Sequence, residues 1–316
     1  MSRTLRRGCL ALLLVSLSCG GDVERVFLSI GTGGTGGVYY PLGGAIASRL
    51  SLADAARLVT AEVTGGSVEN VNRLRSGQLD LAFALGVTVD AAYRGGPDAR
   101  PSFEELRVIA PLYPNLTHVL VRGGSAIESF ADLAGGRVSV GSAGSGTEQV
   151  ARQLLAAHGL SYDTVDERFL SFSESASALR DGALDAAILS VGYPAGAVLE
   201  ALSTGGATLL PLDGEGVAKL LLDHTYYALG SIPAGVYPGV AEPVPTIAMM
   251  NWIVGRADLP DAVVADLLNI LGPERVSLER THDMARQIDL EALDHPPAPL
   301  HAVTEAWRVR PRQGVR

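Results

Sequence analysis

Cysteine, lysine and long hydrophobic runs are scarce in this chain of 316 residues. Only two cysteines occur, Cys9 and Cys19, and the first lies in an expected export signal, so the mature chain can form no internal disulfide and no cysteine metal site. The 25 basic residues are outnumbered by 34 acidic ones, and the formal net charge of −9 argues against nucleic acid as the main partner. The six histidines show no H-x-x-x-H or HExxH spacing, so we expect no metal and no cofactor.

The N-terminus has the order of an export signal. Three arginines in the first seven residues precede an apolar run, Leu10–Leu17, that is too short to span a bilayer comfortably. Cys19 follows the run closely, as in a bacterial lipoprotein signal, although Ser16 stands where leucine is usual. Residues 1–19 are therefore predicted to be a lipoprotein-like signal, with lipid on Cys19 and a periplasmic or cell-envelope location; an ordinary cleaved signal is the alternative.

Two glycine-rich segments each follow a strand-like run and precede a helical pattern. The first is GTGGTGG (31–37), before a helix expected at Pro41–Leu50, and the second is GSAGSGT (141–147), before a helix expected at Glu148–Leu155. Glycine lets the main chain approach a ligand closely, and a helix start offers unpaired N–H groups and a partial positive charge. The chain therefore offers two cradles suited to a carboxylate or phosphate.

Other interpretations of these segments are weaker. The first also fits the G-x-G-x-x-G dinucleotide fingerprint, but its next expected strand, Val59–Val63, carries Glu62 inside rather than an acidic residue at its end. The second has no lysine before Thr147, as a P-loop requires, and no G-x-S-x-G motif of a nucleophile elbow. A plain tight turn stays open for both.

Part of the sequence recurs. LRSGQLDLA (74–82) and LRDGALDAA (179–187) share six residues in register, and each lies between an expected helix and a buried strand. Asp80 and Asp185, in equivalent places, are interpreted as structural groups at strand starts rather than as an acid–base pair. Alternating strands and helices predict α/β lobes with parallel sheets, and the length suggests two of them. Chance recurrence of a common turn is the alternative.

Six segments together resemble the TAXI-type solute-binding proteins of tripartite ATP-independent periplasmic (TRAP) transporters. They are TGGTGGVYYPLGGAIA (32–47), TGGSVENVNRLRSGQLDLA (64–82), LYPNLTHVLVR (112–122), DLAGGRVSVGSAGSGTE (132–148), LRDGALDAAILSVGYP (179–194) and IPAGVYPG (232–239). The resemblance covers nearly the whole mature chain. It implies a two-lobed class II periplasmic binding protein fold with the ligand cleft between lobes, residues 22–113 plus 240–316 forming lobe 1 and 114–239 lobe 2.

The same resemblance implies a function. The protein would be no enzyme, but would capture a small carboxylate, such as glutamate, glutamine or a keto or dicarboxylic acid, and deliver it to an ion-gradient-driven TRAP membrane permease. A sensor for a signalling receptor and an envelope enzyme on the same scaffold are the alternatives. The motif matches, with Tyr193 added because it ends a strand beside a proline, predict ligand contacts from Thr32, Gly33, Thr35, Tyr39, Ser67, Ser142, Ser145, Gly146, Thr147 and Tyr193.

Two further positions bear on the ligand. Tyr113 also ends an expected strand beside a proline, where a cleft or hinge would lie, although core packing is the alternative. After the third strand, family members often carry Gln-Ser-Asp or Gln-Ala-Asp, whereas Leu85–Thr88 here reads LGVT. The usual amino-acid specificity is therefore not implied, and a less polar or differently charged carboxylate is an alternative.

Overall fold

The computed structural model describes residues 25–95, 101–203, 205–293 and 295–310, so the predicted signal and Cys19 lie outside the described residues. The strands are β1 (Val26–Gly31), β2 (Arg57–Glu62), β3 (Leu81–Leu85), β4 (Leu106–Arg122), β5 (Arg137–Ser139), β6 (Asp166–Arg168), β7 (Ala186–Val191), β8 (Ala207–Leu210), β9 (Tyr227–Ile232) and β10 (Val244–Arg256). The helices are α1 (Tyr39–Ala53), α2 (Ser67–Arg75), α3 (Gly86–Arg94), α4 (Gly146–Ala157), α5 (Phe172–Arg180), α6 (Gly196–Ser203), α7 (Gly214–Asp223), α8 (Asp261–Leu271), α9 (Val276–Glu279) and α10 (Ala302–Arg308), with 3-10 turns at Phe130–Leu133 and Asp283–Gln287.

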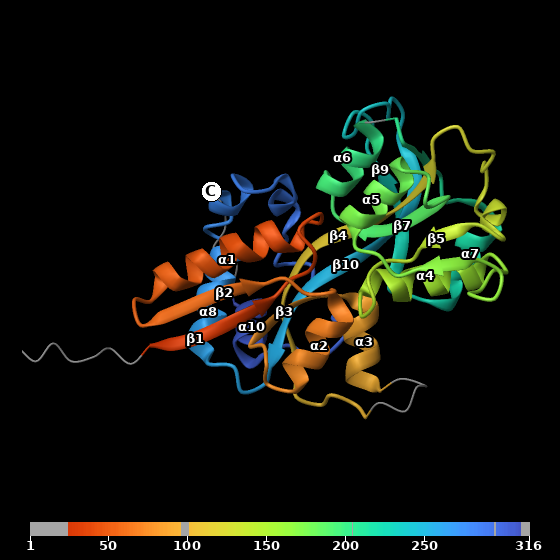
Figure 1. Cartoon of the computed structure of the whole chain (residues 1–316). Helices are drawn as coiled ribbons and strands as arrows, with labels where there is room; N and C mark the ends of the chain where they lie inside the picture. Colours follow the sequence, from red (N-terminus) through yellow and green to blue (C-terminus); the bar gives the residue numbers. More distant parts are fainter. Residues whose placement is uncertain (1–24, 96–100, 204, 294, 311–316) are drawn as a thin grey trace, which may run out of the picture.

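All these strands belong to one mixed sheet, with the order β2-β1-β3-β10-β4-β7-β5-β6, while β8 pairs with β4 and β9 with β10. The long antiparallel strands β4 and β10 run through the middle. On one side of them lie β1–β3, here called the β1 half, and on the other lie β5–β7, the β5 half (Figure 1). Read outward from the middle, β10-β3-β1-β2 in one half matches β4-β7-β5-β6 in the other, in agreement with the internal repeat.

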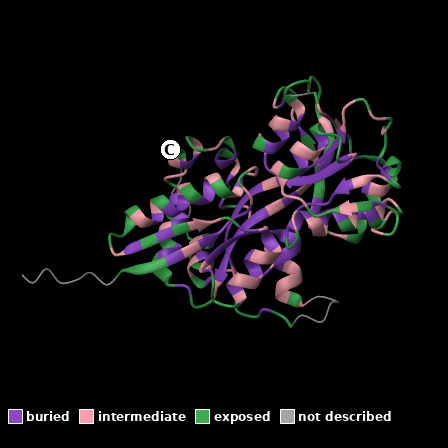
Figure 2. Cartoon of the chain, in the orientation of Figure 1, coloured by how far each residue is buried: buried purple, intermediate pink, exposed green. Residues whose placement is uncertain are grey.

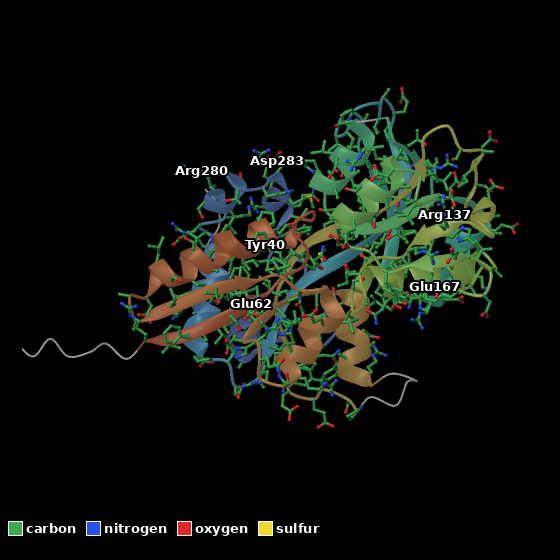
Figure 3. All side chains as sticks on the ribbon, viewed as in Figure 1. Tyr40, Glu62, Arg137, Glu167, Arg280 and Asp283 are labelled. Atoms are coloured by element: carbon green, nitrogen blue, oxygen red, sulfur yellow. The ribbon has the colours of Figure 1, made fainter. Side chains whose placement is uncertain are left out.

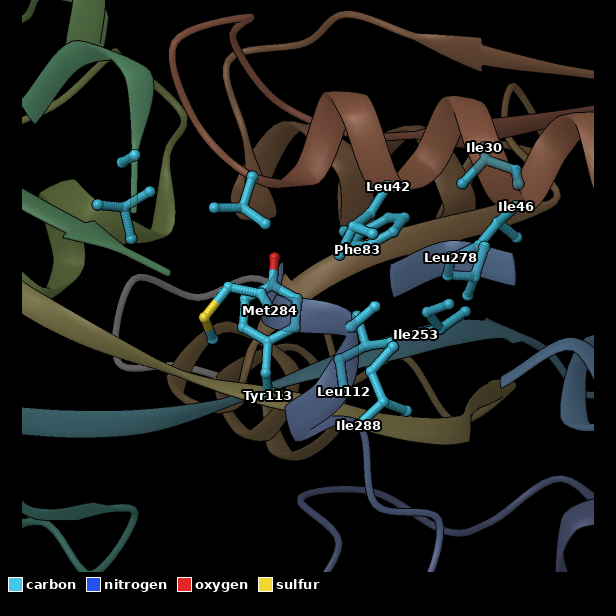
Figure 4. Close-up of a cluster of buried hydrophobic side chains, with 14 of the residues drawn as sticks. Ile30, Leu42, Ile46, Phe83, Leu112, Tyr113, Ile253, Leu278, Met284 and Ile288 are labelled. Carbon is cyan, nitrogen blue, oxygen red and sulfur yellow. The ribbon is translucent and has the colours of Figure 1, made fainter. Parts of the chain in front are cut away.

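Alternate side chains of the strands supply separate cores on the two faces of the sheet. In β3, Leu81 and Phe83 belong to a cluster that includes Leu42 and Ile46 of α1, whereas Ala82 and Ala84 belong to a cluster with residues of α2 and α3. Figure 4 shows part of the first cluster beneath α1, and Figure 2 shows that buried residues follow the sheet through both halves. The strands β3 and β7, which lie next to β10 and β4, are thus buried on both faces.

The predicted division into lobes has no loop at its first boundary, because residue 113 lies inside the continuous strand β4. Its second boundary, at residues 239 and 240, precedes β10. The division stays a prediction. Within the described residues, no helix combines the length and apolar character needed to cross a membrane.

The two aspartates of the repeat play matching structural roles. Asp80 accepts a hydrogen bond from the N–H of Ser29 in β1 at 2.8 Å, and Asp185 accepts one from the N–H of Arg137 in β5 at 3.0 Å. Each carboxylate therefore ties the start of β3 or β7 to the neighbouring strand. This is the structural role that the sequence predicted for them.

Asp185 should contribute to acid stability. Its carboxylate also accepts hydrogen bonds from Nε and Nη2 of Arg137, both at 3.0 Å, and this pairing lowers the pKa of Asp185 from 3.8 to about 2. A depressed pKa stabilises the fold above about pH 4, and this contribution is lost as the pH falls towards about 2. We expect Asp185→Asn to flatten the fall in unfolding free energy over this range, measured by urea titration. Asp181→Asn, at an exposed neighbour, is the control; equal curves for Asp185→Asn and wild type would contradict the prediction.

Candidate functional site

A cavity lies between the β1 half and the β5 half. It sits where β1, β2, β5 and β6 end and their helices begin, which is where α/β sheets commonly bind ligands. The lining residues are Gly33, Gly34, Gly37, Val38, Tyr39, Gly65, Gly66, Ser67, Leu85, Tyr113, Asn115, Ser142, Ser145, Gly146, Thr147, Ser171, Phe172, Ser190, Val191 and Gly192.

Four helix N-termini converge on the cavity. Helices α1, α2, α4 and α5 follow β1, β2, β5 and β6, so their starts face one another across the space between the halves (Figure 1). In the described part of the chain, the first two N–H groups of each helix have no hydrogen-bond acceptor. The cavity-lining residues that carry such groups are Tyr39, Ser67, Gly146, Thr147 and Phe172. These groups and the helix dipoles favour an anionic ligand.

Charged side chains take no part in the cavity wall. None of the described lining residues is Asp, Glu, Lys, Arg or His. Labelled charged side chains, such as Arg137 and Glu167 in one half and Arg280 and Asp283 in the other, lie at the periphery (Figure 3). No group of three or more His, Cys, Asp or Glu among the described residues is placed to hold a metal ion. An anion would therefore be bound by main-chain N–H groups and hydroxyls.

A buried hydrogen-bond network forms the floor beneath the cavity. Asn251 of β10 is fully buried; its Oδ1 accepts from the hydroxyl of Tyr39, and its Nδ2 donates to the carbonyl of Tyr113 at 2.8 Å and to Oδ1 of Asn115 at 2.6 Å. Nδ2 of Asn115 then donates to the carbonyl of Ser190 at 2.8 Å. The network joins α1, β10, β4 and β7, so it fixes the first turn of α1 against both central strands.

Tyr113 has the one unsatisfied hydroxyl among the described cavity-lining tyrosines. Its side chain is fully buried and its hydroxyl has no hydrogen-bond partner among the described residues. Figure 4 shows the ring rising from β4 with the hydroxyl directed away from the strand. Burial raises the pKa of Tyr113, so the hydroxyl keeps its proton and can donate it. Because an unpaired buried hydroxyl costs about 1–3 kcal/mol, an acceptor atom of a ligand here would be stabilising.

Seven of the ten residues predicted to contact ligand line this cavity. They are Gly33, Tyr39, Ser67, Ser142, Ser145, Gly146 and Thr147. Thr147 is buried, and Ser145 also caps α4, its Oγ accepting the N–H of Glu148 at 3.1 Å. Both predicted glycine cradles thus face the same cavity.

The other three lie outside the cavity wall. Thr32 continues the pairing of β1 with β2: its N–H and its hydroxyl both donate to the carbonyl of Glu62, at 3.0 and 2.7 Å. Thr35 is exposed, and the hydroxyl of Tyr193 accepts from Nε2 of Gln287 at 2.9 Å. Thr32 and Thr35 were predicted because they belong to the glycine-rich motif, and Tyr193 because it ends a strand beside a proline. Strand pairing and turn geometry direct their side chains away from the cavity.

The predicted ligand set omitted several lining residues. Tyr113 had been marked only as a cleft or hinge position, and Asn115, Ser190, Ser171 and Phe172 had not been assigned to the site. The sequence does indicate a special role for Asn251 in the network beneath the cavity, because this residue interrupts an otherwise apolar strand pattern, TIAMMNWIV. Phe172 carried no signal, since it begins an ordinary amphipathic helix.

The two halves touch each other at the rims of the cavity. The N–H of Glu69 in α2 donates to the carbonyl of Gly144 at 2.9 Å, and the N–H of Ala197 donates to the carbonyl of Gly36 at 3.2 Å. A Cβ at Gly65 would lie 2.7 Å from the carbonyl oxygen of Ala143, so the halves approach closely here only because this position is glycine. The structure therefore shows the halves closed on the cavity.

Comparison with known proteins agrees with this architecture. A family model described as the NMT1-like family matches residues 30–307. The chain is similar to PhnD1 from Prochlorococcus marinus (MIT 9301) in complex with methylphosphonate, with 15% identity, 87% of this chain and 95% of that chain covered, and a TM-score of 0.54. It is also similar to the alkanesulfonate-binding protein SsuA from Xanthomonas axonopodis pv. citri bound to MOPS, with 18% identity, 91% and 85% covered, and a TM-score of 0.50. These likenesses concern the fold, and they confirm the predicted α/β fold of a periplasmic binding protein.

Proposed function

We propose that this chain, which belongs to the NMT1-like family, is a non-enzymatic, extracytoplasmic solute-binding protein that captures a small carboxylate. One observation carries the proposal: four helix N-termini with unpaired N–H groups, and the unsatisfied hydroxyl of Tyr113, converge on a cavity without charged side chains. Water is excluded when the halves close, and each N–H contact then gains strength in a less polar medium.

The transport role is the further part of the proposal. The resemblance to TAXI proteins supports delivery of the solute to a TRAP membrane permease, and the signal-like N-terminus supports a periplasmic location with lipid on Cys19. The two similar solved structures were obtained with methylphosphonate and with MOPS, both small molecules with an anionic group. This supports an anionic solute, and we propose that the two predicted lobes close on it.

Removing two hydroxyls from the second cradle should weaken binding. We expect Ser145→Ala with Thr147→Ala to lower the affinity of the best-binding carboxylate by about tenfold or more, because both residues line the cavity. A thermal-shift screen of carboxylates identifies that ligand first; at about 100 times its dissociation constant it should add ~2.7 kcal/mol to stability. Calorimetry then compares the variant with the wild type.

The control removes a similar pair of hydroxyls away from the cavity. Ser161→Ala with Thr164→Ala removes two hydroxyls from an exposed turn, in which the hydroxyl of Thr164 accepts the N–H of Ser161 and donates to its carbonyl. Because loss of the Ser145 cap itself costs about 0.5–2 kcal/mol, the melting temperature of each variant is measured without ligand. An unchanged affinity in a folded double variant would contradict the assignment of the second cradle.

A further inference from the structure

We propose that the solute is a carboxylate with one charged group, an apolar body and no ammonium group, such as a branched-chain 2-oxo acid. This inference rests on the proposed function and narrows the ligand of the same cavity. Of the amino acids and the keto and dicarboxylic acids that the sequence resemblance implies, it selects keto acids with an apolar body. It follows from the uneven distribution of polar atoms in the cavity and from the absence of a partner for a positive charge among the described lining residues.

One end of the cavity is polar. A Cβ at Gly146 would lie 2.8 Å from Oγ of Ser67, and a Cβ at Gly66 would lie 3.3 Å from Ser145, so the starts of α2 and α4 abut each other. Thr147 lies beside Ser145, since both would meet a Cβ at Gly141 at 2.9 Å. The N–H groups and hydroxyls of this end can surround one carboxylate.

The other end carries most of the apolar side chains of the wall, beside the hydroxyls of Ser171 and Ser190. A Cβ at Gly192 would lie 2.9 Å from the ring of Tyr113 and 3.2 Å from Val38, and a Cβ at Gly37 would lie 3.4 Å from the ring of Phe172. Val191 precedes Gly192 and lines the same wall. The body of a ligand held at the polar end would rest on these side chains, with the Tyr113 hydroxyl available to a ligand oxygen.

Among the described lining residues, a ligand ammonium group would have no anionic partner. The carboxylates of Glu69 and Glu174 lie outside the lining and bond to lining residues: Glu69 accepts the N–H of Gly65 at 2.7 Å, and Glu174 accepts the N–H of Ser171 at 2.8 Å. The side chain of Leu85 adds an apolar surface beside Gly146, at the polar end. Burying a charged group without a counter-charge is costly, so zwitterionic amino acids should bind poorly.

Matched ligand pairs test the inference on the native protein. Calorimetry compares 4-methyl-2-oxopentanoate with leucine, and 2-oxoglutarate with glutamate; each pair differs chiefly by the oxo or ammonium group. We expect 4-methyl-2-oxopentanoate to bind at least about 100-fold tighter than leucine and tighter than 2-oxoglutarate. Leucine or glutamate binding as tightly as its oxo acid would overturn the inference and leave the proposed function standing. Binding of none of the four would overturn the inference and count against the proposed function as well.

A variant of the apolar end gives a second measurement. Phe172→Ala removes a half-buried ring from this end and should weaken 4-methyl-2-oxopentanoate about tenfold while changing pyruvate, which lacks the branched body, by less than about threefold. Phe169→Ala is the matched control, because Phe169 is an exposed phenylalanine of the same half that does not line the cavity. Equal losses for both ligands, or none for either, would overturn the placement of the apolar body.

Discussion

Gly65→Ala should weaken solute binding by about tenfold or more while leaving the fold intact. A Cβ at this position would lie 2.7 Å from the carbonyl oxygen of Ala143 and 3.0 Å from Oε2 of Glu69. Gly65 belongs to the β1 half and Ala143 to the β5 half, so the main clash arises only when the halves close. Because Ala143 meets it with main-chain atoms, no side-chain rotation relieves the contact. The closed form should lose free energy relative to the open one, and affinity falls with the population that can bind.

Two measurements on the Gly65→Ala protein separate closure from folding. Calorimetry with the best-binding carboxylate gives the affinity, and small-angle scattering gives the radius of gyration with and without that ligand. The control is Gly44→Ala in α1, where a Cβ would meet nothing within 4 Å and helix propensity improves. Wild-type affinity together with a wild-type decrease in radius on binding would contradict this account of closure.

Asn251→Ala should be the most destabilising of the substitutions considered. The side chain is fully buried and bonds three groups at once, the hydroxyl of Tyr39, the carbonyl of Tyr113 and the amide of Asn115. Its removal leaves buried polar groups without partners, at about 1–3 kcal/mol each, and creates a small cavity. We expect a loss of about 3–5 kcal/mol of unfolding free energy, measured by urea titration without ligand.

A surface asparagine supplies the comparison. Asn269→Ala removes an exposed side chain of α8 that bonds Glu274 and should change stability by no more than about 0.5 kcal/mol. A change of less than about 1 kcal/mol for Asn251→Ala would show that the network beneath the cavity relaxes or is replaced by water. In the expected case, ligand affinity also falls, because Tyr39 loses the group that holds its hydroxyl.

Much of the fold could be predicted because its signals are local. The strand–glycine–helix order at residues 31–37 and 141–147 placed the starts of α1 and α4 at Pro41 and Glu148, close to the observed Tyr39 and Gly146, since turns and helix starts depend on a few neighbouring residues. The copied segments around Asp80 and Asp185 correctly indicated two similar halves. The same locality explains why Thr32 and Thr35 were predicted as ligand contacts but lie outside the cavity wall, because a motif states which residues are near in sequence but not where each side chain points.

By itself the sequence determined the α/β class and the two glycine cradles, and it predicted an anionic ligand, because backbone conformation and helix dipoles follow from residue type and order. Only the tertiary structure decided which side chains surround the space between the cradles. Tyr113 and Asn115 line the cavity and Asn251 lies beneath it, because β4 and β10 pair antiparallel across the middle of the sheet, which brings together residues about 140 positions apart in the chain. The uncharged wall and its apolar end arise from this packing, and no local pattern encodes them, since each side chain comes from a different element.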